Sequence, residues 1–322
     1  MLNLSKFNFT ELLITNFVRM GQILLITGAT GLVGKALVKQ CLADGHTVHY
    51  LSTRKSKILQ QSNYKGFYWN PQDQTIDLAC FEGVEVVFNL AGASIAQRWS
   101  NAAKTSILSS RTDALALLYS SIETHKFPVK QIISASAIGI YPDSKTRYYD
   151  EKFQGTDASF LRSVVKLWEG SLKPFQPLGI KTTALRIGIV LDTHEGALPK
   201  IMQPIKKYFG AALGSGDQWQ SWIHIDDLVR LFMFVLEYKL EGVYNAVAPN
   251  PVQQTELTKL IAKILQRPLL LPNVPEFVLR LTLGEMCAIA LESQRVCATK
   301  IQDAGFKFNY IELEPALEDL IP

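Results

Sequence analysis

Thr27-Gly28-Ala29-Thr30-Gly31-Leu32-Val33-Gly34 stands between a short β-type run, Ile23 to Thr27, and a helix-type run, Leu32 to Ala43. A glycine-rich turn in this setting is typical of a strand that passes into a helix in a dinucleotide-binding domain. Gly28 suits the tight turn, Gly31 lets a pyrophosphate approach the backbone, and Gly34 lets the helix pack closely on the strand. The free N–H groups of the helix N-terminus favour that anion. We therefore predict that Gly28, Thr30, Gly31, Leu32, Val33 and Gly34 bind a cofactor; the alternative is a turn of the same shape without a ligand.

Short apolar runs and helical stretches alternate beyond this turn, which is typical of a parallel sheet covered by helices on both faces. The pattern predicts an α/β fold, a Rossmann-type doubly wound parallel sheet with a smaller C-terminal lobe. The expected strands are Ile23 to Thr27, Thr47 to Ser52, Gly66 to Trp69, Glu85 to Asn89, Lys130 to Ser134 and Lys181 to Ile187. The expected helices are Leu32 to Ala43, Ala102 to Thr124, Ala158 to Lys173 (ended by Pro174 and Pro177), Leu198 to Tyr208, Asp226 to Tyr238, Gln254 to Leu265 and Leu313 to Leu320.

The chain divides at two places. Met20 stands directly before the first strand and would itself make a natural start, so residues 1–20 are interpreted as an N-terminal extension. Residues 21–190 form the predicted NAD(P)-binding domain, to which later segments return. Beyond residue 190 glycine and proline become more frequent and loops longer, which indicates a substrate-side lobe over 191–322.

Composition excludes several classes of protein. The 322 residues are 48% hydrophobic with a formal net charge of +4, and the chain has neither a basic tail for nucleic acid nor an apolar run long enough for a membrane span. Its four cysteines form no C-x-x-C pair, which argues against a zinc site and a disulfide framework. We expect a cytoplasmic protein with a small-molecule substrate, no metal, no nucleic acid and no membrane partner, and a homodimer is among the oligomeric states left open.

The end of the second predicted strand bears on the choice of cofactor. There the chain reads Ser52-Thr53-Arg54-Lys55, without the acid that would bind the ribose 2′-hydroxyl of NAD. Arg54, next to Thr53 and helped by Lys55, suits the 2′-phosphate of NADP through charge-assisted hydrogen bonds. NADP is therefore predicted over NAD, and the alternative is that these are solvated loop charges.

Asn89-Leu90-Ala91-Gly92 resembles the segment that follows the fourth strand in extended short-chain dehydrogenase/reductases, and it adds Leu90, Ala91 and Gly92 to the predicted cofactor site. Further segments resemble one atypical branch, the sugar-nucleotide epimerase-like family, whose members end in a domain of unknown function, here 270–322. These segments are Arg98 to Ser100, Ser110-Arg111, Gly214 to Gly216, Trp222 to Asp227, Asn245 to Val252, Gly284-Glu285, Ser293 to Val296 and Ala304 to Phe308. The resemblance implies a cleft between the two parts, with Arg186 on the nicotinamide side. The alternative for Arg186 is a salt bridge to a buried acid.

The resemblance also implies a serine and a Tyr-x-x-x-Lys pair, in which the lysine lowers the pKa of the phenol that exchanges a proton with substrate. Ser136 best matches the serine. Counting back from Glu169 puts Leu161 and Val165 at the Tyr and Lys positions, and Lys166 is one residue late on the helix. Tyr141 is the best substitute acid, with a packed turn tyrosine as the alternative.

Other polar residues in the C-terminal half have ordinary interpretations. Asp226 or Asp227 is expected to cap a helix rather than act as an acid. His224 is expected to be structural. Trp219 and Trp222 are either walls of a substrate site or simple packing.

Two functions follow from these observations. One is an atypical NADP-dependent oxidoreductase or epimerase on a polar carbonyl or sugar-like (nucleotide-sugar) compound. The other is a non-catalytic NADP-binding regulatory or scaffold protein that has lost the Tyr/Lys pair.

Overall fold

An eight-stranded sheet forms the centre of the computed structural model, which describes residues 21–155 and 159–322. Its strand order is β12-β8-β6-β5-β1-β2-β3-β4. The strands are β1 (Ile23–Thr27), β2 (Thr47–Ser52), β3 (Tyr64–Asn70), β4 (Thr75–Ile76), β5 (Val84–Asn89), β6 (Gln131–Ala137), β8 (Lys181–Ile187) and β12 (Gly242–Ala246). All neighbours pair in parallel except β3 and β4, which are antiparallel.

The sheet is doubly wound. From β1 the chain moves outward through β2 and β3, then crosses to the other side of β1 and continues through β5, β6 and β8. The strand order therefore reverses between β1 and β5. In open α/β sheets, ligands bind at the carboxyl ends of the strands beside such a reversal. The predicted fold class is confirmed.

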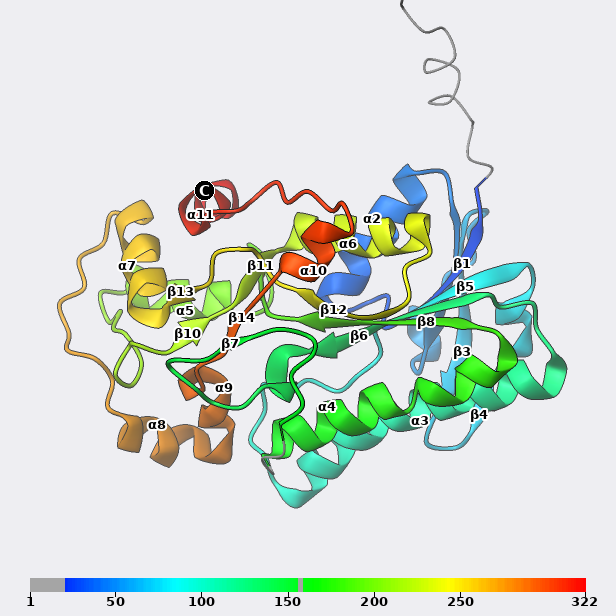
Figure 1. The fold of residues 1–322 in the computed structure, drawn as a ribbon, viewed down its shortest axis with the longest axis horizontal. Helices are drawn as coiled ribbons and strands as arrows, with labels where there is room; N and C mark the ends of the chain where they lie inside the picture. Colours follow the sequence, from blue (N-terminus) through cyan, green and yellow to red (C-terminus); the bar gives the residue numbers. More distant parts are fainter. Residues whose placement is uncertain (1–20, 156–158) are drawn as a thin grey trace, which may run out of the picture.

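Helices cover both faces of the sheet. α2 (Leu32–Ala43) and α6 (Ile225–Tyr238) lie on one face, and α3 (Asn101–His125) and α4 (Phe160–Gly170) lie on the other (Figure 1). Both faces are buried, which explains why the strands are continuous apolar runs rather than alternating ones. Ser100 and Ser159 start α3 and α4, because each hydroxyl accepts a backbone N–H of the first turn.

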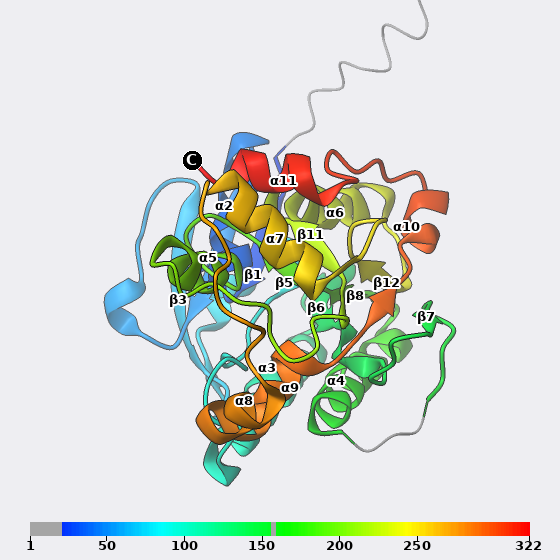
Figure 2. The ribbon, with the colours of Figure 1, turned by 90° about the vertical axis from the view of Figure 1, so that its left-hand side faces the viewer.

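The second lobe lies at the carboxyl end of the strands. Its helices are α5 (Leu198–Lys206), α7 (Gln254–Ile264), α8 (Glu276–Leu283), α9 (Ala288–Leu291), α10 (Thr299–Asp303) and α11 (Leu313–Leu320). Figure 2 shows α7 and α11 packed side by side. Three two-stranded sheets complete the lobe: β9 (Ile189–Leu191) with β11 (Trp222–His224), β10 (Trp219–Gln220) with β13 (Val252–Gln253), and β7 (Tyr148–Tyr149) with β14 (Arg295–Val296).

Two connections tie the lobe to the main sheet. β12 follows α6 in sequence and pairs with β8 at the edge of the sheet. The pairing of β7 with β14 joins a loop that follows β6 to the last quarter of the chain. The second lobe and the domain built on the eight-stranded sheet are therefore interleaved along the sequence.

Most expected elements occur close to their predicted bounds. One detail was wrong: α4 ends at Gly170, before the two prolines that were expected to end it. Pro174 and Pro177 lie instead in the short 3-10 helix η4 (Lys173–Leu178). The other 3-10 helices are η1 (Lys55–Lys57), η2 (Leu78–Phe81), η3 (Ile138–Ile140) and η5 (Gly284–Cys287). The predicted extension over 1–20 and the predicted helix start at Ala158 lie outside the described residues.

Across the described residues, none of the helices combines the length and apolar character that crossing a membrane requires.

Candidate functional site

The glycine turn lies where β1 passes into α2. Gly28 has a φ of +69°, and a Cβ there would lie 2.6 Å from the carbonyl oxygen of Leu90. A Cβ at Gly34 would lie 2.2 Å from the carbonyl oxygen of Gly28, so only glycine lets α2 approach the turn this closely. Gly31 is the N-cap of α2 and offers no side chain to its first turn. The N–H groups of that turn are therefore left to an anion.

A groove of about 680 Å³ opens in front of this turn, and we call it the turn groove. Two of its basic groups come from the segment after β2, namely Arg54 and Lys57. Asp113, on α3, is the acid among the described lining residues. The rest of the lining is Gly28, Thr30, Leu51, Ser52, Thr53, Trp69, Asn70, Pro71, Gln72, Ala91, Gly92, Ala93, Ser109 and Ser110. The groove thus joins the glycine turn, the end of β2 and the segment after β5.

A buried hydrogen-bond network holds the strand ends that form the turn groove. The Thr27 hydroxyl donates to Asn89 Oδ1 (2.9 Å), and Asn89 Nδ2 donates to the Ser134 hydroxyl (3.0 Å). Thr27 also accepts the backbone N–H groups of Leu90 and Ala91. All three side chains of the network are fully buried. The ends of β1 and β5 are therefore fixed to each other and to the middle of β6 before any ligand binds.

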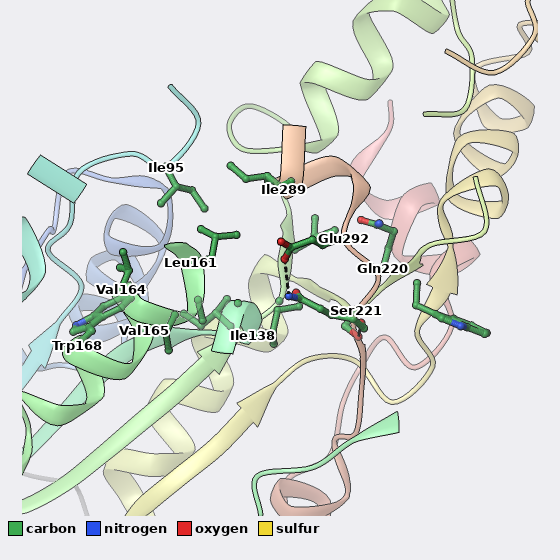
Figure 3. A pocket seen from close by; sticks show the side chains of 18 of the residues that line it. Ile95, Ile138, Leu161, Val164, Val165, Trp168, Gln220, Ser221, Ile289 and Glu292 are labelled. Atoms are coloured by element: carbon green, nitrogen blue, oxygen red, sulfur yellow. Dashed lines mark hydrogen bonds between the residues drawn. The ribbon is translucent and has the colours of Figure 1, made fainter. Parts of the chain in front are cut away.

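A second, smaller cavity of about 160 Å³ lies between α4, the ends of β6 and β8, and the second lobe, and we call it the inner pocket (Figure 3). Its walls are mainly aliphatic and aromatic. Leu161 and Val165 of α4, at the Tyr and Lys positions counted from sequence, both line it, whereas Lys166 is exposed to solvent. Leu161 and Val165, which the sequence count puts at the Tyr and Lys positions, thus face the same cavity, and the wall that they form is apolar.

Arg111 connects the two cavities. Its guanidinium lines the inner pocket, lies over the Trp168 ring at 4.9 Å, and donates through Nη1 to the carbonyl oxygens of Ala93 (3.2 Å) and Ile107 (2.7 Å). A Cβ at Gly92, in the turn groove, would lie 3.0 Å from Arg111 Cζ. Burial lowers the pKa of Arg111 to about 10, so the group is still charged at neutral pH.

Ser136, Tyr141 and Arg186 form one buried network with Glu169. The Glu169 carboxylate accepts the Ser136 hydroxyl (2.6 Å) and two N–H groups of Arg186, from Nε at 2.8 Å and Nη2 at 2.9 Å. Arg186 Nη1 donates to the Tyr141 hydroxyl (3.0 Å), which donates to Asn245 Oδ1 (2.7 Å). Burial alone would lower the pKa of Arg186, but the hydrogen bonds and charge of Glu169 outweigh it and raise that pKa.

This network changes the interpretation of the predicted catalytic pair. The described lining of the inner pocket contains Ala137 and Ile187 but neither Ser136 nor Tyr141, whose hydroxyls already have protein partners. Burial raises the pKa of Tyr141 to about 12 against the opposing effect of Arg186, which is the reverse of what a proton-exchanging phenol needs. For Arg186, the alternative of a salt bridge to a buried acid is the arrangement observed.

Comparison with known proteins gives the family. Residues 24–159 match the NAD dependent epimerase/dehydratase family, and residues 274–320 match a domain of unknown function, DUF1731. An epimerase family protein of Staphylococcus saprophyticus is 36% identical over 299 residues, which cover 92% of this chain and 98% of that protein. The chain belongs to the epimerase family.

Solved structures of the epimerase family share the fold. The human epimerase family protein SDR39U1 (isoform 2), crystallised with NADPH, matches with a TM-score of 0.80 and 26% identity over 93% of this chain and 99% of its own. A nucleoside-diphosphate sugar epimerase from Corynebacterium glutamicum matches with a TM-score of 0.73 and 27% identity over 93% of this chain and 58% of its own. The predicted resemblance to the epimerase-like branch is confirmed.

The C-terminal domain of this epimerase family protein contributes directly to the inner pocket. Ala288, Ile289, Glu292 and Gln294 line it, and all four lie within residues 274–320. The segment is fixed in place, because the Ser293 N–H donates to Asp143 and the Ser293 hydroxyl donates to the Ser144 carbonyl.

The other polar candidates have structural roles. His224, not Asp226 or Asp227, is the N-cap of α6: its Nδ1 accepts the Asp226 N–H at 3.1 Å, so the prediction of an aspartate cap was wrong. Nε2 faces Asp319 Oδ2 at 3.2 Å. His224, Asp226 and Asp319 each offer a ligand atom, and these atoms lie within 4.8 Å of one another, an arrangement that exposed acids often adopt without an ion.

The predicted cofactor residues come together only in part. Gly28, Thr30, Thr53, Arg54, Ala91 and Gly92 line the turn groove, and Gly31, Leu32, Val33 and Gly34 form the start of α2 beside it. Leu90 packs under the turn. Arg186 lies in the Glu169 network. Trp219 lines the inner pocket, whereas Trp222 is fully buried and donates to the Asn250 carbonyl.

Sequence reasoning missed Lys57, Arg111, Glu169 and Glu292 as site residues. Lys57 follows Arg54 by one 3-10 turn and could have been found from that spacing. Arg111 was quoted only as a family marker. No sequence signal joins Glu169 to Arg186, or Glu292 to α4.

Proposed function

We propose that this chain binds a nicotinamide dinucleotide, NADP in preference to NAD, and acts as an oxidoreductase or epimerase on a carbonyl or alcohol carbon. One observation supports this most: Arg111, which lines the inner pocket, donates to the carbonyl oxygen of Ala93, which lines the turn groove. Together the two cavities run from the basic segment after β2, past the free amides of α2, to an apolar recess at the ends of β6 and β8. The residues present fit a dinucleotide, because the glycine turn leaves the space that a side chain would fill.

The preference for NADP rests on charge. Arg54 and Lys57 line the turn groove at the end of β2, where an NAD-binding domain carries an acid for the ribose hydroxyl. Two cations at that position suit a 2′-phosphate. The human relative crystallised with NADPH is consistent with this preference.

Different residues of the chain would bind different parts of the cofactor. A bound nicotinamide would supply or accept a hydride. The first turn of α2 would hold the diphosphate, Arg54 and Lys57 the 2′-phosphate, and Arg111 the region between groove and pocket. Ser136 and Tyr141 would act as positioning residues, because their hydroxyls join Glu169 and Arg186 in fixing the ends of β6 and β8.

Calorimetric titration with NADP, NADPH, NAD and NADH tests the binding. Gly31→Ala should weaken all four at least tenfold, since the new methyl group projects toward the amides that hold the diphosphate. The variant should fold, because that Cβ would have only one neighbour, Gly28 O, at an ordinary 3.4 Å. Gly170→Ala, where a Cβ meets nothing within 4 Å, is the matched control. Equal affinities in Gly31→Ala and Gly170→Ala would refute the assignment.

The second candidate function, a non-catalytic NADP-binding regulatory or scaffold protein, is favoured by the apolar wall at Leu161 and Val165. It predicts thermal stabilisation by NADPH without turnover, because a ligand that binds the folded state raises apparent stability by mass action. Following NADPH absorbance across a panel of ketones and aldehydes separates the two. Reproducible steady-state oxidation of NADPH would exclude the scaffold.

A further inference from the structure

The inner pocket is a small, mainly apolar space. Its walls include Ile138, Leu161, Val164, Val165, Trp168 and Ile289 (Figure 3). Its volume of about 160 Å³ is close to the roughly 150 Å³ of an apolar cavity that holds benzene. A mainly apolar space of this size suits a six-membered hydrocarbon ring better than a hydroxyl-rich sugar, whose hydroxyls would lose hydrogen bonds to water there.

Several polar groups of the pocket are already used by the protein. The Ser221 hydroxyl donates to the Gln294 carbonyl at 2.8 Å and accepts the Val296 N–H at 2.9 Å. The Gln294 amide donates to the Tyr141 carbonyl at 2.9 Å. These bonds fix the wall of the pocket and leave it few groups for a polyol.

Gln220 and Glu292 carry polar groups at the second-lobe end of the pocket, whereas Arg111 lies on another wall with its Nη1 bonded to two backbone carbonyls. At the second-lobe end, Gln220 carries an amide, and Glu292 carries a carboxylate beside it (Figure 3). The Gln294 amide holds Glu292 Oε2 at 3.3 Å, so the carboxylate is oriented rather than loose. One hydroxyl or carbonyl oxygen on an otherwise apolar ligand would satisfy this end.

An outer cavity of about 540 Å³ adjoins the inner pocket and shares Leu161, Ala288 and Glu292 with it. Among the described residues that line it, four are acids, Glu292 included, and two are bases, Lys145 and Arg280. Both bases already have carboxylate partners: Lys145 pairs with Asp217 and Arg280 with Glu276. Glu285 in turn pairs with Lys104, so the pairs still leave an excess of acids at the approach, which disfavours a diphosphate there.

We propose that the inner pocket takes an uncharged, mainly apolar molecule about the size of a six-membered ring, bearing one hydroxyl or carbonyl group, and that it does not take a nucleotide sugar. This deepens the proposed function, on which it rests for treating the inner pocket as the substrate side of the site. Glu292 and Gln220 would hold the ligand oxygen, and the α4 wall would hold the ring.

Saturation-transfer NMR with cyclohexanol, cyclohexanone and UDP-glucose tests the proposal. NADP is present at saturation in one series, so that UDP-glucose cannot place its diphosphate at the glycine turn, and is left out in another. The ring probes should bind saturably and more tightly than UDP-glucose. Ile289→Asp should weaken them at least tenfold, because it puts a charge on the apolar wall; Ile289 is 36% exposed, so the variant should fold. Ile311→Asp, at a residue 48% exposed outside the described lining of both cavities, is the matched control.

Each outcome is decisive. Tighter binding of UDP-glucose in the presence of NADP, no binding of either ring, or equal ring binding in Ile289→Asp and Ile311→Asp would overturn the proposal. NADP binding is measured separately by calorimetry. If NADP does not bind but the ring probes do, the proposed function fails while the ligand class stands. If NADP binds but the ring probes do not, the ligand class fails while cofactor binding stands.

Discussion

Replacing Glu169 by glutamine should destabilise the protein by about 3 kcal/mol, because it removes the charge that Arg186 faces behind the inner pocket. The two side chains are only 16% and 8% exposed, and the carboxylate accepts three hydrogen bonds, two from Arg186 and one from Ser136. A buried guanidinium left without its counter-charge typically costs 3–5 kcal/mol. Glutamine keeps the shape of the side chain and one acceptor oxygen, so we expect a loss at the lower end of this range.

Urea unfolding followed by circular dichroism measures this loss as a lower midpoint with an unchanged slope. Glu85→Gln is the control, because Glu85 pairs with Lys130 in an exposed salt bridge and should change stability by less than about 1 kcal/mol. The double variant Glu169→Leu with Arg186→Met should recover most of the stability, since both buried charges are gone. A Glu169→Gln midpoint equal to that of Glu85→Gln would refute the reasoning.

Three further predictions follow from individual side chains. Arg54→Gln should weaken NADP binding about 10- to 100-fold, measured by calorimetry, and leave NAD binding unchanged, because one charge-assisted hydrogen bond contributes about 1.5–3 kcal/mol. Lys55→Gln is the control: the native Lys55 side chain lies over Tyr68, so this variant should bind both cofactors as the native chain does. The unfolding free energy should fall as pH rises from about 10 to 12, because burial raises the folded-state pKa of Tyr141 to about 12 and an unfolded tyrosine ionises near 10, and Tyr141→Phe should fall less steeply. A thiol reagent should label the half-buried Cys297 first, with one thiol modified per chain in the rapid phase. Cys41 should react slowly, because burial raises its pKa to about 12. Rapid labelling of a second thiol would count against this.

The main sheet could be predicted because its strands are continuous apolar runs interrupted by turn residues. Ile23–Thr27, Thr47–Ser52 and Lys181–Ile187 occur at their predicted bounds. The glycine turn was equally readable, since steric needs at Gly28 and Gly34 restrict those positions to glycine. Local patterns of this kind need no knowledge of distant partners.

The inner pocket could not be predicted in the same way, because its residues come from far along the chain. Leu161 meets Glu292 only after the β7–β14 pairing brings the C-terminal domain across the end of the sheet. The partner of Arg186 depends on how α4 packs against β6, the neighbour of β8, which no single helix or strand pattern encodes. Ser136 matched a family serine in sequence, but its direction on β6 depends on the register with Arg186 on β8.

Strand β12 reaches the sheet from beyond α6 and covers the outer edge of β8. A shortened chain ending near residue 190 would leave β8 with a row of unpaired N–H and C=O groups. Such an exposed edge strand promotes aggregation. The N-terminal half, which carries the glycine turn, therefore depends on β12 from the later part of the chain to complete its sheet. Swaps of second-lobe segments between relatives should keep Gly242–Ala246 with its original sheet, because the outer edge of β8 is otherwise left uncovered.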